Sequence, residues 1–370
     1  MTQKLLLAIM LALCANQAKA LNYFEAKQNF EDKYKVNLGA DGAYRLQNLK
    51  SQNVSQLFIT PYLRKNISDN KYGKTDFDFS MNIVRFGGQK PADTASRYGM
   101  ATLFNSYDAD YTELYELYFS YTLPSDFKRI TIGAGQIPVS KFDGPTTSDM
   151  QSYGFLNSAT SQNTTFIYPT AGIGAYAQVE LSQNVTASMG VTDASNPLAD
   201  GIRLSGFGKN SYFTSVHYTP NFYNRYKGSY SLLLYSKPHV KKAPYSGQGW
   251  SLYFAQDVSD KHSLFLRING ATGNNVTVNG SYSVGWLWLN PFNRPQNDKL
   301  GVAYSVNKIN KKATDDFVYN RYEHITEAYY DYKITENFSL LSDAQLYLRR
   351  GFAKTNSPAA VVSLGLNLSL

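Results

Sequence analysis

Cysteine is nearly absent from this sequence. The only cysteine in 370 residues is Cys14, close to the N-terminus. Without a second cysteine the fold cannot rest on disulfides, nor on the thiolates of most structural zinc sites. Cys14 follows Leu13, whereas a lipid-attachment cysteine needs a small residue before it, so we do not expect lipidation. A chain of this length can bury enough surface to fold without such cross-links.

Long hydrophobic runs are absent as well. Mean hydropathy is −0.36, and beyond residue 20 nothing approaches the roughly 20 apolar residues of a membrane-spanning helix. The one apolar run, residues 5–15, follows Lys4 and precedes Ala18-Lys19-Ala20. A basic start, an apolar middle and a small-residue cleavage site are typical of a Sec-type signal peptide. We therefore predict a signal peptide over residues 1–20, because the run is too short for the alternative, a membrane anchor.

Histidines are few, and acidic residues are outnumbered by basic ones. The four histidines are His217, His239, His262 and His324, and we expect His262 in a tight turn. Their spacing matches no metal-binding or serine-nucleophile motif, so we predict no enzyme activity, no metal and no cofactor. The predicted signal removes two of 36 basic residues and none of 28 acidic ones, which lowers the formal charge from +8 to +6. The basic residues are scattered, which argues against a nucleic-acid partner.

Aromatic residues, by contrast, are abundant. They make up 15% of the chain, with 30 tyrosines, whose apolar ring and polar hydroxyl suit a membrane interface. The chain is then either a soluble β protein or a barrel whose apolar residues are hidden in alternation. Alternation of apolar with small or polar residues runs over 360–370, 338–348 and a hairpin at 172–192. Trp286 and Trp288 alternate in the same way, where an aromatic girdle would need them.

The predicted strands are long, and the connections between them alternate in length. Their lengths approach the 9–11 residues of a tilted transmembrane strand, whereas globular strands have about 5–6. The connections are short at 124–129, 182–184, 259–262 and 334–337, and long at 138–171, 193–210, 237–248, 307–322 and 351–358. Short turns opposite long loops are typical of outer-membrane barrels. We predict an all-β, transmembrane antiparallel β-barrel of about 16 strands over residues 55–370. Residues 21–54 are either its first strand or a periplasmic or plugging extension.

The alternation also predicts which polar side chains face the lumen. In the strand over residues 114–123 we place Glu116, Tyr118 and Ser120 inside, and Tyr115 toward lipid. A basic residue turned toward lipid at mid-membrane costs about 2–4 kcal/mol, which supports an inward Arg267. The full set predicted to line the pore or its constriction is Glu116, Tyr118, Glu180, Arg267, Glu327, Asp343, Gln345 and Arg349. The long connection 138–171 is the candidate to fold inward, with Lys141, Asp143, Asp149 and Tyr153.

Two interpretations of these lumen charges stay open. Charges of both signs with aromatic rings suit neutral, hydroxyl-rich solutes, because arginine donates to and carboxylates accept from sugar hydroxyls. Alternatively, the charges only pair with one another and make the wall rigid.

Several stretches resemble the carbohydrate-selective porin family, the OprB type. They are Leu114–Tyr118 with Ile130–Gln136, Tyr168–Ala175, Gly190–Ala194, Phe265–Arg267, Asn293–Gly301, Glu327–Tyr330 and Asp343–Gln345. The resemblance implies a 16-stranded barrel that admits sugars by diffusion, with a constriction of arginine and acidic residues matched here by Arg267, Glu116 and Glu327. Ser342 stands where the family usually has proline, and Leu370 where it has an aromatic residue. These departures indicate a divergent member, so we do not carry the family's sugar specificity over to this chain.

The sequence thus predicts a passive outer-membrane porin of a Gram-negative bacterium, for carbohydrates or similar small hydrophilic solutes. Its expected partners are these solutes, outer-membrane lipids and the barrel-assembly machinery, and the choice between monomer and homotrimer stays open. One alternative is a general or anion-preferring porin, favoured by the basic residues Lys237, Lys241, Lys242, Lys308, Lys311 and Lys312. Another is an adhesin or structural surface barrel whose pore is blocked.

Overall fold

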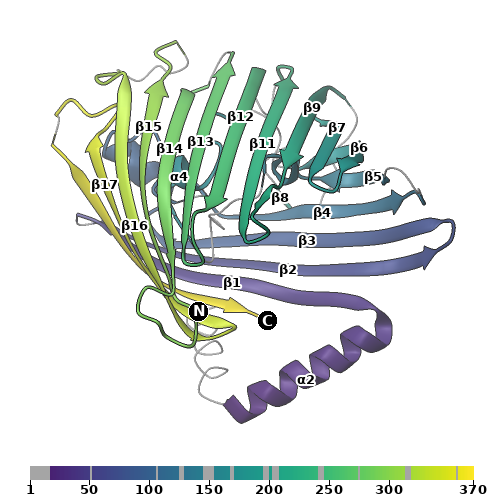
Figure 1. Cartoon of the computed structure of the whole chain (residues 1–370). Coiled ribbons are helices and arrows are strands. Elements are labelled where there is room, and N and C mark those ends of the chain that lie inside the picture. The colour runs from purple at the N-terminus through teal and green to yellow at the C-terminus, as the bar shows by residue number, and fades with distance from the viewer. Residues whose placement is uncertain are drawn as a thin grey trace.

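Sixteen long strands form one antiparallel sheet that closes on itself, because β1 (Val36–Leu49) pairs with β18 (Ala359–Ser369) (Figure 1). The structure is a computed structural model, and it describes residues 17–50, 52–105, 107–124, 129–144, 154–166, 171–194, 200–201, 208–240, 246–273, 276–312, 318–355 and 357–370. The predicted fold class, a 16-stranded antiparallel barrel, is confirmed.

The remaining strands follow one another around the barrel in chain order, each paired with the next long strand. They are β2 (Gln52–Asn70), β3 (Gly73–Gly88), β4 (Tyr111–Thr122), β5 (Ile130–Ile137), β6 (Gly172–Ser182), β7 (Val185–Asp193), β9 (Asn210–Tyr218), β11 (Tyr226–Lys237), β12 (Gly247–Asp257), β13 (His262–Thr272), β14 (Val278–Leu289), β15 (Lys299–Ile309), β16 (Tyr322–Thr335) and β17 (Phe338–Arg349). The two-residue strand β8 (Asp200–Gly201) pairs in parallel with β4, and the two-residue strand β10 (Asn221–Phe222) pairs with the beginning of β11. The helices are α2 (Gln17–Tyr34), α3 (Pro91–Arg97), the 3₁₀ turn η1 (Val139–Phe142) and α4 (Ser158–Ser161).

Each strand presents one face to the lumen and the other to the outside, since successive side chains alternate. On β18, Ser363 and Asn367 are buried inside, whereas Val362 and Leu364 on the outer face are 60% and 56% exposed. An exposed apolar row is what contact with lipid requires. The alternation predicted from the sequence is therefore confirmed here.

Aromatic side chains gather on the outer face near one end of the strands. The Trp286 ring stacks with His262 and with Trp288, at centroid distances of 5.3 and 5.8 Å. Trp286 Nε1 also donates a hydrogen bond of 3.1 Å to His262 Nδ1. Tyr218 and Tyr230 also pack against each other, but edge to face. His262 closes the expected tight turn, since the Ser259 amide donates to its carbonyl at 3.2 Å, and it is also the first residue of β13. The ring cluster suits the girdle at a membrane interface.

The longest connections lie at one end of the barrel, opposite most of the short turns. Residues 71–72, 183–184, 258–261 and 336–337 join strands at one end, and 89–110, 138–171 and 310–321 at the other. Both α2 and the C-terminus lie at the short-turn end (Figure 1). Residues 21–54 contain most of α2, then β1 and the beginning of β2. The predicted signal peptide falls mostly outside the described residues. Among the described residues, no helix combines the length and apolar character needed to cross a membrane.

The turn between β14 and β15 carries the most specific of the family-like motifs, and it is held by Asp298. Both oxygens of this buried carboxylate accept hydrogen bonds from Arg294, at 2.9 Å each. The Tyr330 hydroxyl and the Lys333 amide, both of β16, donate at 2.6 and 2.9 Å. Burial alone would raise the pKa of Asp298, but these hydrogen bonds outweigh it and the pKa is lowered. The motif therefore fixes a turn to the neighbouring strand.

Inward aromatic rings lie flat against glycines of neighbouring strands. A Cβ added at Gly285 of β14 would stand 2.2 Å from the ring of Phe265 on β13. Gly301 of β15 faces Tyr329 at the same spacing, and Gly249 of β12 faces Tyr235 at 2.1 Å. Each glycine thus makes room for a ring that would otherwise project into the lumen.

We expect Gly285→Ala to destabilise the barrel, because the new methyl group must displace the ring of Phe265. Overpacking of this kind costs about 1–3 kcal/mol. The measurement is the temperature at which the folded barrel loses its compact migration on a semi-native gel.

Gly280→Ala on the same strand is the matched control, since its Cβ would meet Lys308 at an ordinary 3.6 Å. Equal melting of the two variants would contradict the role given to the ring–glycine contact.

Candidate functional site on the inner face of the barrel

Two of the long connections fold into the barrel instead of projecting from it. One joins β3 to β4 and contains α3. The other joins β5 to β6 and contains η1 and α4. Although α4 follows β5, it contacts β14 and β15, on a distant part of the wall. We call residues 101–105 and 154–162 the two inward segments. They are joined where the Ser158 amide donates to the Leu103 carbonyl, at 3.0 Å, and the Leu103 amide to the Ser158 hydroxyl, at 3.1 Å.

The first inward segment is held by Glu323 of β16. Its carboxylate accepts the amides of Ala101 and Thr102 at 2.7 and 2.9 Å, and the Thr102 hydroxyl at 2.5 Å. The Gly351 amide donates to the same group at 3.2 Å. Glu323 is fully buried. A buried carboxylate with four donors is well compensated, so it anchors the segment firmly.

The second inward segment is held by Glu327 and by Asn157. Glu327 Oε1 accepts the amides of Leu156 and Asn157 at 2.6 and 2.9 Å. The Asn157 side chain caps α4 by accepting the Ala159 amide at 2.9 Å. Its Nδ2 donates to Gln345 Oε1, at 2.8 Å. Without these acceptors, the backbone amides of Leu156, Asn157 and Ala159 would be buried with no hydrogen-bond partner.

Gln345 connects the two inward segments to the wall. Besides accepting from Asn157, it donates through Nε2 to the Phe104 carbonyl at 3.0 Å and to Asp343 Oδ1 at 2.9 Å. The Ser363 hydroxyl donates to the same Asp343 oxygen at 3.2 Å. One side chain therefore couples both segments to the carboxyl group of Asp343.

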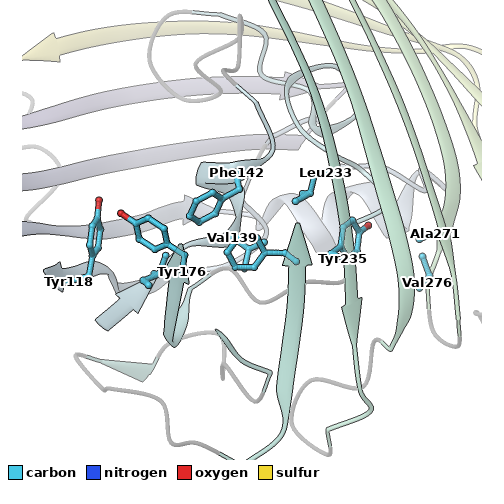
Figure 2. Packing of buried hydrophobic residues seen from close by; sticks show 10 residues of the cluster. Tyr118, Val139, Phe142, Tyr176, Leu233, Tyr235, Ala271 and Val276 are labelled. Atoms are coloured by element: carbon cyan, nitrogen blue, oxygen red, sulfur yellow. The ribbon is translucent and has the colours of Figure 1, made fainter. Parts of the chain in front are cut away.

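The turn η1 is held by an apolar cluster inside the barrel. Figure 2 shows Val139 and Phe142 between Tyr118 and Tyr176 on one side and Leu233 and Tyr235 on the other. The Phe142 ring packs against Tyr176 at a centroid distance of 5.1 Å. Rings packed in this way add about 0.5–1.5 kcal/mol each to the burial of their area.

A buried ion pair ties the end of η1 to β13. Arg267 Nη1 lies 3.8 Å from Asp143 Oδ2, with 3% and 6% of the two side chains exposed. The guanidinium also stands 5.0 Å from the ring centroid of Tyr253. Arg267 and Asp143 were both predicted site residues, and the structure brings them together.

A second group of charges on the inner face is exposed or partly exposed. We call Arg64, Asp78, Glu116 and Lys141 the charged row. Arg64 Nε lies 3.5 Å from Asp78 Oδ1, and 63% of the Arg64 side chain is exposed. Glu116 accepts a hydrogen bond of 2.8 Å from Ser80. Lys141 of η1 is exposed, is attracted by Glu116 and Asp78, and donates to the Tyr118 hydroxyl.

The predicted site residues therefore divide between these settings. Arg267, Glu327, Asp343 and Gln345 face inward but are buried beneath the inward connections. Glu116 and Tyr118 face inward on β4, beside η1. Glu180 lies at the short-turn end of β6, with Arg129 at 3.9 Å. Asp149 and Tyr153 fall outside the described residues.

Two residues lie on the face opposite to the one predicted, and each adjoins a β-bulge. The bulge at Ser80/Met81 leaves Tyr115 unpaired on β4, and its hydroxyl lies 2.6 Å from Ser140 of η1, so it points inward. Arg349 pairs with His324, which bonds Tyr304 on the outer face at 2.6 Å. The bulge between His324 and Ile325 shifts the phase, so Arg349 lies outside. A prediction from strict in–out alternation fails after a β-bulge, because the extra residue of the bulge shifts the side chains that follow to the opposite face.

Sequence reasoning missed Glu323 and Asn157. Glu323 lies four residues before Glu327, hence on the same face of β16, and extending the alternation by two residue pairs would have found it. Asn157 precedes Ser158-Ala159-Thr160, a pattern that favours a helix N-cap, but nothing local says which wall the helix meets.

A groove of about 1300 Å³ lies on the outer face, away from the charged row. Exposed side chains such as Met189, Tyr212, Trp250 and Tyr282 line it. It is apolar and opens toward the lipid, so it is not part of the path through the lumen. In the described part of the chain, no three His, Cys, Asp or Glu side chains are grouped to hold a metal ion.

The carbohydrate-selective porin family, OprB, matches residues 72–235 and 206–370 of this chain. Porin AaxA of Chlamydia pneumoniae is 33% identical over 303 residues, covering 80% of this chain and 68% of that protein. Porin AaxA of Chlamydia felis is 30% identical over 322 residues, covering 83% and 70%. The high-pH structure of Pseudomonas putida OprB superposes with a TM-score of 0.78 at 14% identity, over 94% of this chain and 97% of that one.

We expect Arg267→Met to loosen η1, because it leaves the buried Asp143 carboxylate without its arginine. Removing one partner of a buried ion pair costs about 3–5 kcal/mol. Planar-bilayer recordings should show a changed and noisier conductance, and the compact gel form should melt at a lower temperature.

Arg225→Met is the control, since Arg225 and Asp260 form a fully exposed pair at the short-turn end. If Arg267→Met conducts and melts like this control, the buried pair does not position η1.

Proposed function

Because the chain belongs to the carbohydrate-selective porin (OprB) family, we propose that this outer-membrane porin admits small, neutral, hydroxyl-rich solutes by passive diffusion. No ATP and no ion gradient enter the proposal. The observation that carries it is the charged row, a set of both signs on the inner face beside η1, in which Arg64 and Lys141 are exposed and Asp78 and Glu116 partly exposed.

The chemistry of the charged row suits neutral solutes better than ions. Arg64 and Lys141 supply hydrogen-bond donors, and Asp78 and Glu116 supply acceptors, within one patch of wall. Sugar hydroxyls both donate and accept, so they can replace water at such groups at little cost. An ion of either sign would meet attraction from one half of the row and repulsion from the other, so the row offers ions little net stabilisation.

Aromatic rings border the same patch. The Arg64 guanidinium stands 5.7 Å from the Tyr62 ring, and Lys141 Nζ 4.4 Å from the Tyr118 ring. Ring faces offer the apolar side of a sugar a surface to lie on. Tyr62 is partly exposed, whereas Tyr118 is buried against η1, so Tyr62 is the ring we assign to solute contact.

The buried charges have a different role in this proposal. Arg267 and Glu327, predicted from the sequence to form the constriction, bind the inward connections and not solute. They set the width of the path by fixing what projects into it. This is the second of the two interpretations of the lumen charges, applied to these residues.

Export and assembly complete the proposal. We assign residues 1–20 to a Sec-type signal peptide of a Gram-negative bacterium. We expect the barrel-assembly machinery to insert the mature chain into the outer membrane, and the lipid-facing apolar rows support this insertion. Homotrimer formation is kept as an alternative to the monomer.

The proposal is tested by reversing one charge of the charged row. In planar bilayers we expect Lys141→Glu to shift the channel toward cations. Each unit of charge about 4 Å from a passing ion changes the energy of that ion by about 1 kcal/mol in water, so this two-unit reversal changes it by about 2 kcal/mol, roughly a thirty-fold change in permeability. Reversal potentials in a salt gradient measure this shift, and liposome swelling with sugars of graded size measures solute passage.

Lys261→Glu, at an exposed short turn, makes the same change of net charge away from the row. The wild type should admit small sugars and select weakly between ions. Strong anion selectivity without sugar passage would favour the general or anion-preferring porin, and no conductance at all would favour the blocked surface barrel.

A further inference from the structure

Two carboxyl groups meet beneath the inward segments. Glu327 of β16 pairs with Gln345 of β17, which places Glu327 diagonally across from Asp343 on the same inner face, and the two residues are 2% and 3% exposed. Each has one oxygen that is already used. Oε1 of Glu327 accepts the Leu156 and Asn157 amides, and Oδ1 of Asp343 accepts from Gln345 and Ser363.

The remaining oxygen of each carboxyl group lacks a donor. Within the described chain, Glu327 Oε2 and Asp343 Oδ2 are both buried and receive no N–H or O–H in hydrogen-bond geometry. The Thr160 hydroxyl interacts with Glu327 and also shares a hydrogen bond of 3.2 Å with the Ser305 hydroxyl, whereas Asp343 Oδ2 has no such hydroxyl. Two adjacent carboxyl groups in a buried site strongly disfavour both carrying a charge. A proton between them supplies the missing donor.

We propose that Glu327 and Asp343 share one proton, and that this proton holds both inward segments in place. The two groups are positioning residues, since the segments and not the carboxyl groups project toward the path of the solute. One proton on the pair leaves a single negative charge. That charge faces Arg45 of β1, which attracts Asp343, so the cluster of three is neutral overall.

Loss of the proton would release the segments. The strand backbones are fixed by the sheet, so two adjacent anions can separate only by turning their side chains. Turning Glu327 breaks its bonds to Leu156 and Asn157, and turning Asp343 withdraws the acceptor of Gln345, which holds Phe104. Because Ser158 and Leu103 join the two segments, both respond to the same proton.

The charged and titratable groups near the pair are Arg45, Tyr329, Tyr347 and Glu323. Arg45 stays charged at any pH of interest. Tyr329 and Tyr347, whose rings lie near Glu327, are neutral in any state below about pH 10. Glu323, farther along β16, has donors on both oxygens, and its replacement separates any titration of its own from that of the pair.

Single-channel conductance as a function of pH tests the proposal. In wild type we expect one step with the slope of a single proton, between about pH 4 and pH 9, the range that buried carboxyl groups reach. Conductance and open-state noise should rise on the alkaline side, where the segments are released. Glu327→Gln and Asp343→Asn each place a permanent N–H donor between the two groups, so each variant should keep the low-pH conductance at all pH values.

Glu323→Gln is the matched control. It removes a buried carboxylate that holds the same segments, so it should alter the conductance level while the pH step persists. A wild-type conductance that does not vary with pH, or amide variants that titrate like wild type, would overturn the proposal.

Infrared spectroscopy gives a readout that does not depend on conduction. On the acid side of the conductance step, a protonated carboxyl C=O band is expected in wild type and Glu323→Gln, and its loss in Glu327→Gln and Asp343→Asn. Its absence from wild type would also overturn the proposal. The conductance arm rests on the proposed passage through the lumen, so a closed channel with the band present would count against that function and leave the shared proton standing.

Discussion

The rest of the structure depends on one constraint, that no backbone N–H or C=O group can be left unpaired inside a membrane. A sheet with free edges cannot meet it, and the pairing of β1 with β18 removes both edges at once. The same constraint acts inside the barrel, where the inward segments carry backbone groups away from water. Those groups pair with carboxylates of the wall, Glu323 and Glu327, instead of with another strand. The acidic residues of β16 are thus part of the scaffold that shapes the lumen.

Closure of the sheet also divides the side chains into an outer set that faces lipid and an inner set that faces the lumen, and the two sets meet different requirements. Outer side chains need only be apolar, with rings such as Trp286 at the membrane interface. Inner side chains must hold the inward connections and still leave charged groups in water. The wall does both in different places: Arg267 and Asp343 are buried, whereas Arg64 and Lys141 are exposed. A porin built in this way can change its solute preference at the exposed charges without losing the bonds that hold its constriction.

Much of the fold could be predicted because an alternation of period two is a local property. β17 and β18 begin and end within one residue of their predicted bounds, and the hairpin of β6 and β7 turns where expected. Tyr115 and Arg349 could not be placed, since each adjoins a bulge that depends on the partner strand. The inward direction of Arg267 and Glu327 followed from the same alternation. Their contacts with Asp143 and Asn157 did not, because they join residues more than a hundred positions apart and depend on where a long connection folds.

The contacts between rings and glycines also bear on how this wall can vary. Gly285 has room for no side chain because Phe265 occupies the space, and Phe265 lies flat because Gly285 leaves that space. Gly249 with Tyr235, and Gly301 with Tyr329, depend on each other in the same way. Neither member of such a pair can be exchanged alone without a clash or a void. We therefore expect the inner wall to vary by paired replacements, in which a ring and the glycine facing it on the adjacent strand change together.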